Sequence, residues 1–212
     1  MSVFPEIFVL RHGQTEWNAN GRHQGRLDSP LTELGRAQAL AQSRLLAAAI
    51  GNRKDFTAYC SPQGRATDTA SIALAPLGMA TVSDDRLCEI SFGKWEGLTF
   101  DEIASAWPEH VNYADQDPFG WQFQAPGGEG FEDICARALG FLDDLTGPSI
   151  IVTHGITSRI LRGIWLGQGI DEMSGMPGGQ GCVHHLIDGA QQRISSAISE
   201  SITSATKPDH AN

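Results

Sequence analysis

The sequence predicts a three-layer α/β/α sandwich with a mostly parallel central sheet. Short apolar runs rich in β-branched residues alternate with longer stretches of helical periodicity, as in folds whose parallel strands are joined by helices. Two of the apolar runs end beside a His-Gly pair, which is typical of buried strands that deliver polar groups into a crevice. The chain has 212 residues, 41% of them hydrophobic, which is enough for one domain with a core on both faces of the sheet.

The expected strands are short and mostly apolar. They cover residues 6–10, 56–60, 80–83, 149–153, 181–187 and 193–198. The first is followed by Arg11-His12-Gly13, and the fourth by His154-Gly155. Because ligands bind beyond the carboxyl ends of parallel strands, we expect His12 and His154 to meet at one crevice.

Helices are expected between these strands, over about 32–50, 61–75, 99–107, 132–145 and 156–166. Thr32 is the expected N-cap of the first helix, and Gly51 is its stop signal. Ser61 and Pro62 are expected to form the cap and first turn of the second helix, which places Arg65 in a first helical turn.

Residues 108–130 are rich in proline, glycine and aromatic residues, so they are expected to form a loop. Loops of this length often carry specificity, and Trp121 and Phe123 are the expected substrate contacts within it. We expect one domain over 1–199 and a flexible Ser/Thr/Ala-rich tail over 200–212.

The formal net charge of −10 disfavours a general nucleic-acid or anionic-membrane binder, because such proteins need a positive surface. The first residues lack the features of a signal peptide and no segment has the length of a membrane span, so a cytoplasmic protein is expected. The four cysteines are far apart and form no C-x-x-C pair, which predicts reduced thiols. Metal-ligand spacing is also missing, and the adjacent His184 and His185 would point to opposite faces of a strand, so no metal site is predicted.

Arg11-His12-Gly13 combines groups that suit phosphate chemistry. A neutral imidazole can attack phosphorus, and an adjacent arginine stabilises the negative charge of the transferring group. The glycine would let a backbone amide approach an oxyanion closely. An isolated Arg-His pair is more often a surface feature, so the assignment depends on the rest of the sequence.

The surrounding sequence closely resembles the opening of the histidine phosphatase superfamily, the phosphoglycerate-mutase-like proteins. The resemblance is carried by LRHGQTEWN from residue 10, QGRLDSPLTELG from 24, SPQGRA from 61, LCEI from 87, GKWEG from 93 and VTHG from 152. It implies the phosphoglycerate-mutase-like fold, phosphorylation of His12, and Glu89 as the proton donor. Arg11, Arg65 and His154 would then form the phosphate pocket. The further phosphate contacts that it implies are Asn18, Gln24, Gly25 and Gly155.

The family contains both phosphatases and mutases. Cofactor-dependent phosphoglycerate mutases have a longer insert after the Trp-Glu-Gly block, with Tyr, Lys and paired Arg residues for the substrate. Here residues 98–130 contain no arginine or lysine and six acidic residues, which disfavours a bisphosphate. We therefore predict a short, cofactor-free phosphatase of a small-molecule phosphomonoester.

Two alternatives remain at this point. One is a phosphoglycerate mutase primed by 2,3-bisphosphoglycerate, and the other is a non-catalytic module that binds a phosphorylated ligand. The intact set of His12, Arg65, Glu89 and His154 argues against the module. The sequence leaves open the substrate and whether the chain forms a homodimer.

Overall fold

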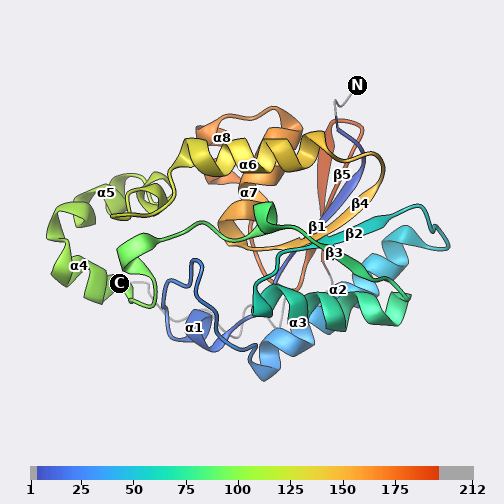
Figure 1. Cartoon of the computed structure of the whole chain (residues 1–212), viewed down its shortest axis with the longest axis horizontal. Helices are drawn as coiled ribbons and strands as arrows, with labels where there is room; N and C mark the ends of the chain where they lie inside the picture. The colour runs from blue at the N-terminus through green and yellow to red at the C-terminus, as the bar shows by residue number, and fades with distance from the viewer. Residues whose placement is uncertain (1–3, 196–212) are drawn as a thin grey trace.

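The computed structural model describes residues 4–195, which form a six-stranded sheet between two layers of helices (Figure 1). From one edge to the other the strands are β3 (Thr81–Ser83), β2 (Thr57–Cys60), β4 (Ser149–Thr153), β1 (Ile7–Arg11), β5 (Val183–Ile187) and β6 (Ala190–Ile194). The first four are mutually parallel, while β5 is antiparallel to β1 and β6 is antiparallel to β5. The predicted three-layer sandwich with a mostly parallel sheet is confirmed.

Each face of the sheet packs against its own helices because strand side chains alternate between the faces. Ile7 and Val9 of β1 join the core beneath α6 (Phe131–Asp143) and α7 (Gly155–Leu166). Phe8 and Leu10 join the core on the other face. The helices that cover that face are α2 (Glu33–Ile50) and α3 (Gly64–Leu74).

Most predicted helix ends are confirmed. The hydroxyl of Thr32 accepts a hydrogen bond from the Gly35 amide at 3.0 Å, and α2 ends at Gly51, whose φ is +57°. The helix expected from Ser61 instead begins at Gly64, so that boundary was wrong. Its N-cap, Gln63, makes no capping bond, because its side chain is bonded to Gly25 and Glu89 instead.

The stretch expected to be a loop contains several short helices. After α4 (Phe100–Ala106) come η4 (Pro108–His110), α5 (Val111–Gln116) and η5 (Gly120–Phe123). The other short helical segments are α1 (Glu16–Ala19), η1 (Ala75–Leu77), η2 (Asp85–Leu87), η3 (Gly93–Trp95) and α8 (Ile170–Gly175).

The last strand also differs from the expectation. It was expected over 193–198, but β6 covers Ala190–Ile194, because Asp188 and Gly189 form a tight turn with φ of +52° and +77°. The expected strand residues 196–198 and the expected tail at 200–212 lie outside the described residues. Within residues 4–195, no helix is long and apolar enough to cross a membrane.

Candidate active site

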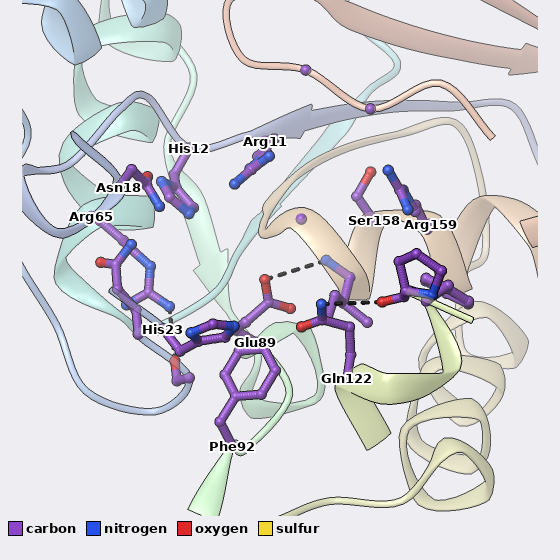
Figure 2. A pocket seen from close by; sticks show the side chains of 18 of the residues that line it. Arg11, His12, Asn18, His23, Arg65, Glu89, Phe92, Gln122, Ser158 and Arg159 are labelled. Carbon is purple, nitrogen blue, oxygen red and sulfur yellow. Dashed lines mark hydrogen bonds between the residues drawn. The ribbon is translucent and has the colours of Figure 1, made fainter. Parts of the chain in front are cut away.

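A cavity of about 620 Å³ opens beside the carboxyl ends of β1 and β4. These strands are direct neighbours, and the His12 amide donates to the Thr153 carbonyl at 2.9 Å. The rings of His12 and His154 consequently lie 5.2 Å apart, which confirms that the two strand ends meet. The residues predicted from sequence that line the cavity are Arg11, His12, Asn18, Gln24, Gly25, Arg65, Glu89 and Gly155 (Figure 2).

His12 is buried with one ring nitrogen already bonded. Its Nδ1 lies 2.7 Å from the Gly13 carbonyl oxygen, which can only accept, so Nδ1 carries the proton and Nε2 keeps its lone pair. Burial, followed by the charges of Arg11 and Arg65, holds the pKa of His12 well below its usual value. The ring is therefore neutral at neutral pH and has a nucleophilic nitrogen.

Gly13 does not play the role expected from sequence. Its amide donates to the Thr69 hydroxyl at 3.0 Å, so it is not offered to an oxyanion. A Cβ at this position would lie 2.2 Å from the Gly35 carbonyl oxygen. The glycine is needed because the loop after β1 packs directly on the first turn of α2.

Arg65 is held rigidly at the start of α3. It donates to the Leu27 carbonyl at 2.7 Å and to the Gly25 carbonyl at 2.9 Å, and it pairs with Asp28 at 3.0 Å. The side chain is only 1% exposed, so its charge acts on the cavity with little screening by water. Asp28 thus has a structural role, because it holds Arg65 in place.

Arg11 supplies a second guanidinium to the cavity. It packs against Gly155, where a Cβ would come 3.2 Å from the Arg11 Cζ, so a larger residue would crowd this arginine. Burial lowers its pKa from the ordinary value. The Nε groups of Arg11 and Arg65 are buried without a hydrogen-bond acceptor in the structure, and a bound anion would supply one.

His154 lies behind the cavity and does not line it. The ring is fully buried, with Nε2 2.7 Å from the Ser61 hydroxyl and Nδ1 without a partner. Burial, followed by the charge of Arg65, holds its pKa well below the usual value. It contacts the His12 ring, but direct contact with a phosphoryl group stays a prediction.

Asn18 and Gly25 are positioned by local structure. The Asn18 Oδ1 accepts from the Thr15 amide at 3.2 Å and from Gln180 Nε2 at 3.1 Å, so its Nδ2 remains available as a donor. Gly25 has φ of +55°, and a Cβ there would come 2.4 Å from Glu96 Oε1.

Glu89 approaches the start of α7. Its carboxylate accepts from the Ile156 amide at 3.3 Å, and from both the amide and the hydroxyl of Thr157 at 3.1 Å. Its sequence neighbours are apolar, but these contacts are polar and hold the carboxylate in one orientation. Glu89 lies on the side of His12 and Arg65 that faces Arg159 (Figure 2).

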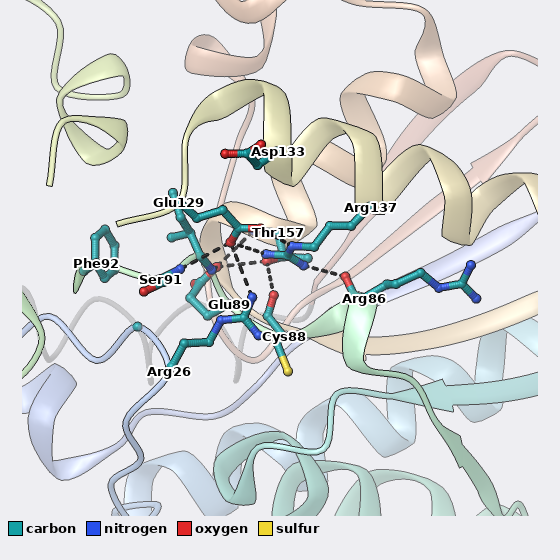
Figure 3. A network of polar contacts seen from close by, with 12 residues as sticks. Arg26, Arg86, Cys88, Glu89, Ser91, Phe92, Glu129, Asp133, Arg137 and Thr157 are labelled. Carbon is teal, nitrogen blue, oxygen red and sulfur yellow. Dashed lines mark hydrogen bonds and ion pairs between the residues drawn. The ribbon is translucent and has the colours of Figure 1, made fainter. Parts of the chain in front are cut away.

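A polar network beside Glu89 fixes the segment that carries it (Figure 3). Arg137 pairs with Glu129 at 2.6 Å, and Glu129 accepts from the Ser91 amide at 3.3 Å. Arg137 also donates to the Arg86 carbonyl. The segment is therefore held on both sides of Glu89.

Sequence reasoning missed part of the cavity wall. Arg159 and Arg162 of α7 line the cavity, as do Phe119 and Gln122. The arginines could have been found, because positions 155, 159 and 162 follow the spacing of one helix face.

The two aromatic residues expected to contact substrate do not line the cavity, so that expectation was wrong. Trp121 is 3% exposed and stacks on Trp95 with ring centres 4.5 Å apart. Phe123 packs edge-on against Phe119 and Phe131. Both rings pack against the core because this segment is helical and not an open loop.

Comparison with known proteins places the chain in a family. The family model described as histidine phosphatase superfamily (branch 1) matches residues 7–198. Phosphoserine phosphatase 1 of Hydrogenobacter thermophilus is 30% identical over 167 residues, which are 76% of each chain. Glucosyl-3-phosphoglycerate phosphatase of Mycolicibacterium vanbaalenii is 36% identical over 179 residues, 78% of this chain and 76% of the relative.

A solved structure of a mycobacterial glucosyl-3-phosphoglycerate phosphatase with VO3 has a TM-score of 0.76 and 28% identity, covering 91% of this chain and 99% of the other. The fold, the cavity at the ends of β1 and β4, and these matches agree. The chain belongs to the histidine phosphatase superfamily.

Proposed function

We propose that this enzyme hydrolyses small phosphomonoesters through a phosphohistidine at Nε2 of His12. The observation that carries the proposal is the buried, neutral His12, whose Nδ1 is bonded to Gly13 and whose ring is under the influence of the charges of Arg11 and Arg65. Membership of a phosphatase family and relatives named as phosphatases support it.

In the first step, Nε2 attacks phosphorus and the bond from phosphorus to the ester oxygen breaks. Glu89 gives its proton to the leaving oxygen, so an alcohol departs instead of an alkoxide. Arg11 and Arg65 balance the charge on the phosphoryl oxygens. Asn18 and Gln24, which line the same cavity, supply neutral contacts to that group.

In the second step, a water molecule loses a proton to Glu89 and attacks phosphorus. The bond between phosphorus and Nε2 breaks, which restores His12 and releases inorganic phosphate. Buried guanidinium groups supply the positive charge in this scheme, so we propose that no metal is needed. A cytoplasmic location and a homodimer stay predictions.

The relatives suggest where to look for substrates. Their names refer to phosphoserine and glucosyl-3-phosphoglycerate, which are both monoesters of hydroxy acids. We favour phosphatase over mutase because residues 98–130 contain no arginine or lysine for a second phosphate.

The test is hydrolysis of p-nitrophenyl phosphate and a panel of natural monoesters, with and without a chelator. A parallel assay follows 3-phosphoglycerate in the presence of 2,3-bisphosphoglycerate. His12→Ala should abolish turnover, whereas the control His110→Ala, a histidine outside the cavity lining, should retain it. Phosphoglycerate interconversion that exceeds hydrolysis would make the enzyme a mutase, and chelator-sensitive turnover would contradict the metal-free scheme.

A further inference from the structure

Arg159 is a half-buried arginine on α7 that faces the cavity without an acidic partner. Its Cζ lies 5.6 Å from the centre of the Phe119 ring, and a Cβ on Gly178 would come 3.4 Å from its Nη2. Its side chain forms no hydrogen bond or ion pair with any residue of the described range 4–195. Phe119 and Gly178 therefore position the guanidinium but leave its donors unused.

Three other arginines that are at least partly buried are each paired with a carboxylate. Arg65 pairs with Asp28 at 3.0 Å, Arg86 with Asp84 at 2.7 Å, and Arg137 with Glu129 at 2.6 Å. Arg11, Arg159 and Arg162 have no carboxylate partner among the described residues, and all three line the cavity. A partly buried cation without a partner is costly unless a ligand neutralises it.

Arg162, the other arginine of α7 that lines the cavity, has no carboxylate partner either. Its donors are directed to Ser158, to His184 Nδ1 at 3.3 Å and to Gln191 at 3.0 Å, none of which is a carboxylate. Proximity to Arg159 contributes to lowering the pKa of Arg162 to about 10, after the larger effect of burial. This end of the cavity therefore has an excess of positive charge.

Arg159 lies across the cavity from His12 and Arg65 (Figure 2), and its charge contributes, after the larger effect of burial, to lowering the pKa of Arg11. Glu89 lies on the side of His12 and Arg65 that faces Arg159, and its negative charge opposes the lowering of the pKa of both Arg11 and Arg159. If the phosphoryl group contacts Arg11 and Glu89 reaches the ester oxygen, the remainder of the substrate extends past Glu89 toward Arg159.

We propose that Arg159 is a specificity-determining residue that binds a carboxylate on the leaving group, so that the preferred substrates are phosphomonoesters of hydroxy acids. The proposal rests on the proposed hydrolysis at His12. A guanidinium presents a planar pair of donors that matches the two oxygens of a carboxylate.

Matched substrate pairs test the proposal directly. O-phospho-L-serine and phosphoethanolamine differ only in the carboxylate, and 3-phosphoglycerate and glycerol 3-phosphate differ by a carboxylate in place of a hydroxymethyl group. The measured quantity is the ratio of kcat/KM between the acidic and the acid-free member of each pair. The variants are Arg159→Gln, Arg159→Lys and the control Arg44→Gln, which removes one charge from an exposed position on α2.

We expect the wild type to prefer the acidic member of at least one pair. Arg159→Gln should lower the ratio for that pair by about 10- to 100-fold, the range for loss of a charged hydrogen bond. Arg159→Lys should restore part of the preference, and Arg44→Gln should leave the ratio at the wild-type value. Equal losses for both members would show a general structural role and overturn the proposal.

A binding measurement separates failure of this proposal from failure of the hydrolytic function. Calorimetry on His12→Ala, alone and combined with Arg159→Gln, gives the affinity for each pair without turnover. If the wild type hydrolyses none of the compounds, the proposed function fails, and the carboxylate proposal is still judged by these affinities. A preference for O-phospho-L-serine or 3-phosphoglycerate that disappears with Arg159→Gln supports it, and equal binding within both pairs overturns it.

Discussion

Replacement of Gly13 by alanine tests how the loop that carries His12 is held. The new Cβ would lie 2.2 Å from the Gly35 carbonyl oxygen, whereas ordinary contacts begin at 3.4 Å, so the two backbones must separate by about 1.2 Å. Neither side can yield easily, because Gly35 is in the first turn of α2 and Gly13 follows directly after His12. We expect a loss of about 1–3 kcal/mol in the free energy of unfolding, as for other overpacked sites.

Gly13→Ala should reduce the activity by more than the loss of stability alone would explain. A displacement of about 1 Å at a reacting group can reduce turnover by about 100-fold, so kcat of Gly13→Ala should fall by that order while the protein stays folded. Urea denaturation and steady-state kinetics measure the two effects. Gly140→Ala is the matched control, because nothing lies within 4 Å of its Cβ position on α6, and it should be neutral or slightly stabilising. Wild-type activity and stability in Gly13→Ala would refute the reasoning.

Three further predictions concern the same site. Because the pKa of His12 is lowered, its nucleophilic neutral form should persist as the pH falls through about 6.5. An acid limb of kcat/KM near that pH, beyond the one that ionisation of the substrate phosphate itself produces, would contradict this assignment. Asp28→Asn removes the ion pair with Arg65. Because Asp28 is 39% exposed, the free energy of unfolding measured by urea denaturation should fall by only about 1 kcal/mol, and KM should rise. An unchanged KM would show that Asp28 does not help to place Arg65. Gln63→Met keeps the side-chain volume but loses the 2.7 Å hydrogen bond that the Glu89 amide donates to Gln63, so kcat should fall about 10-fold with a smaller change in KM. A change in KM alone would contradict a role of Gln63 in positioning Glu89.

The sequence predicted the layers and the strand ends because these depend on local periodicity. The apolar run of β1 and the cap at Thr32 are visible within a few residues. The start of β6 was missed although the signal was present, since Asp188-Gly189 is a common tight-turn pair.

The roles of Gly13 and Trp121 could not be predicted in the same way. The contact of Gly13 with Gly35 depends on how the loop after β1 packs against the first turn of α2, which comes later in the chain. Trp121 is buried because it stacks on Trp95, which lies in another segment. For Glu89, the neighbours in sequence are apolar, but the groups that hold it come from the start of α7, more than 60 residues later.

Identification of the phosphorylated atom would test the phosphohistidine mechanism at His12. The enzyme would be mixed with a monoester substrate and quenched under alkaline conditions, which preserve phosphohistidine. Peptide mapping and phosphorus NMR would then locate the phosphoryl group. We expect the phosphoryl group on Nε2 of His12. It should form within the time of one turnover and be absent from His12→Ala. Turnover without a phosphorylated histidine, or a phosphoryl group on another residue, would contradict the account.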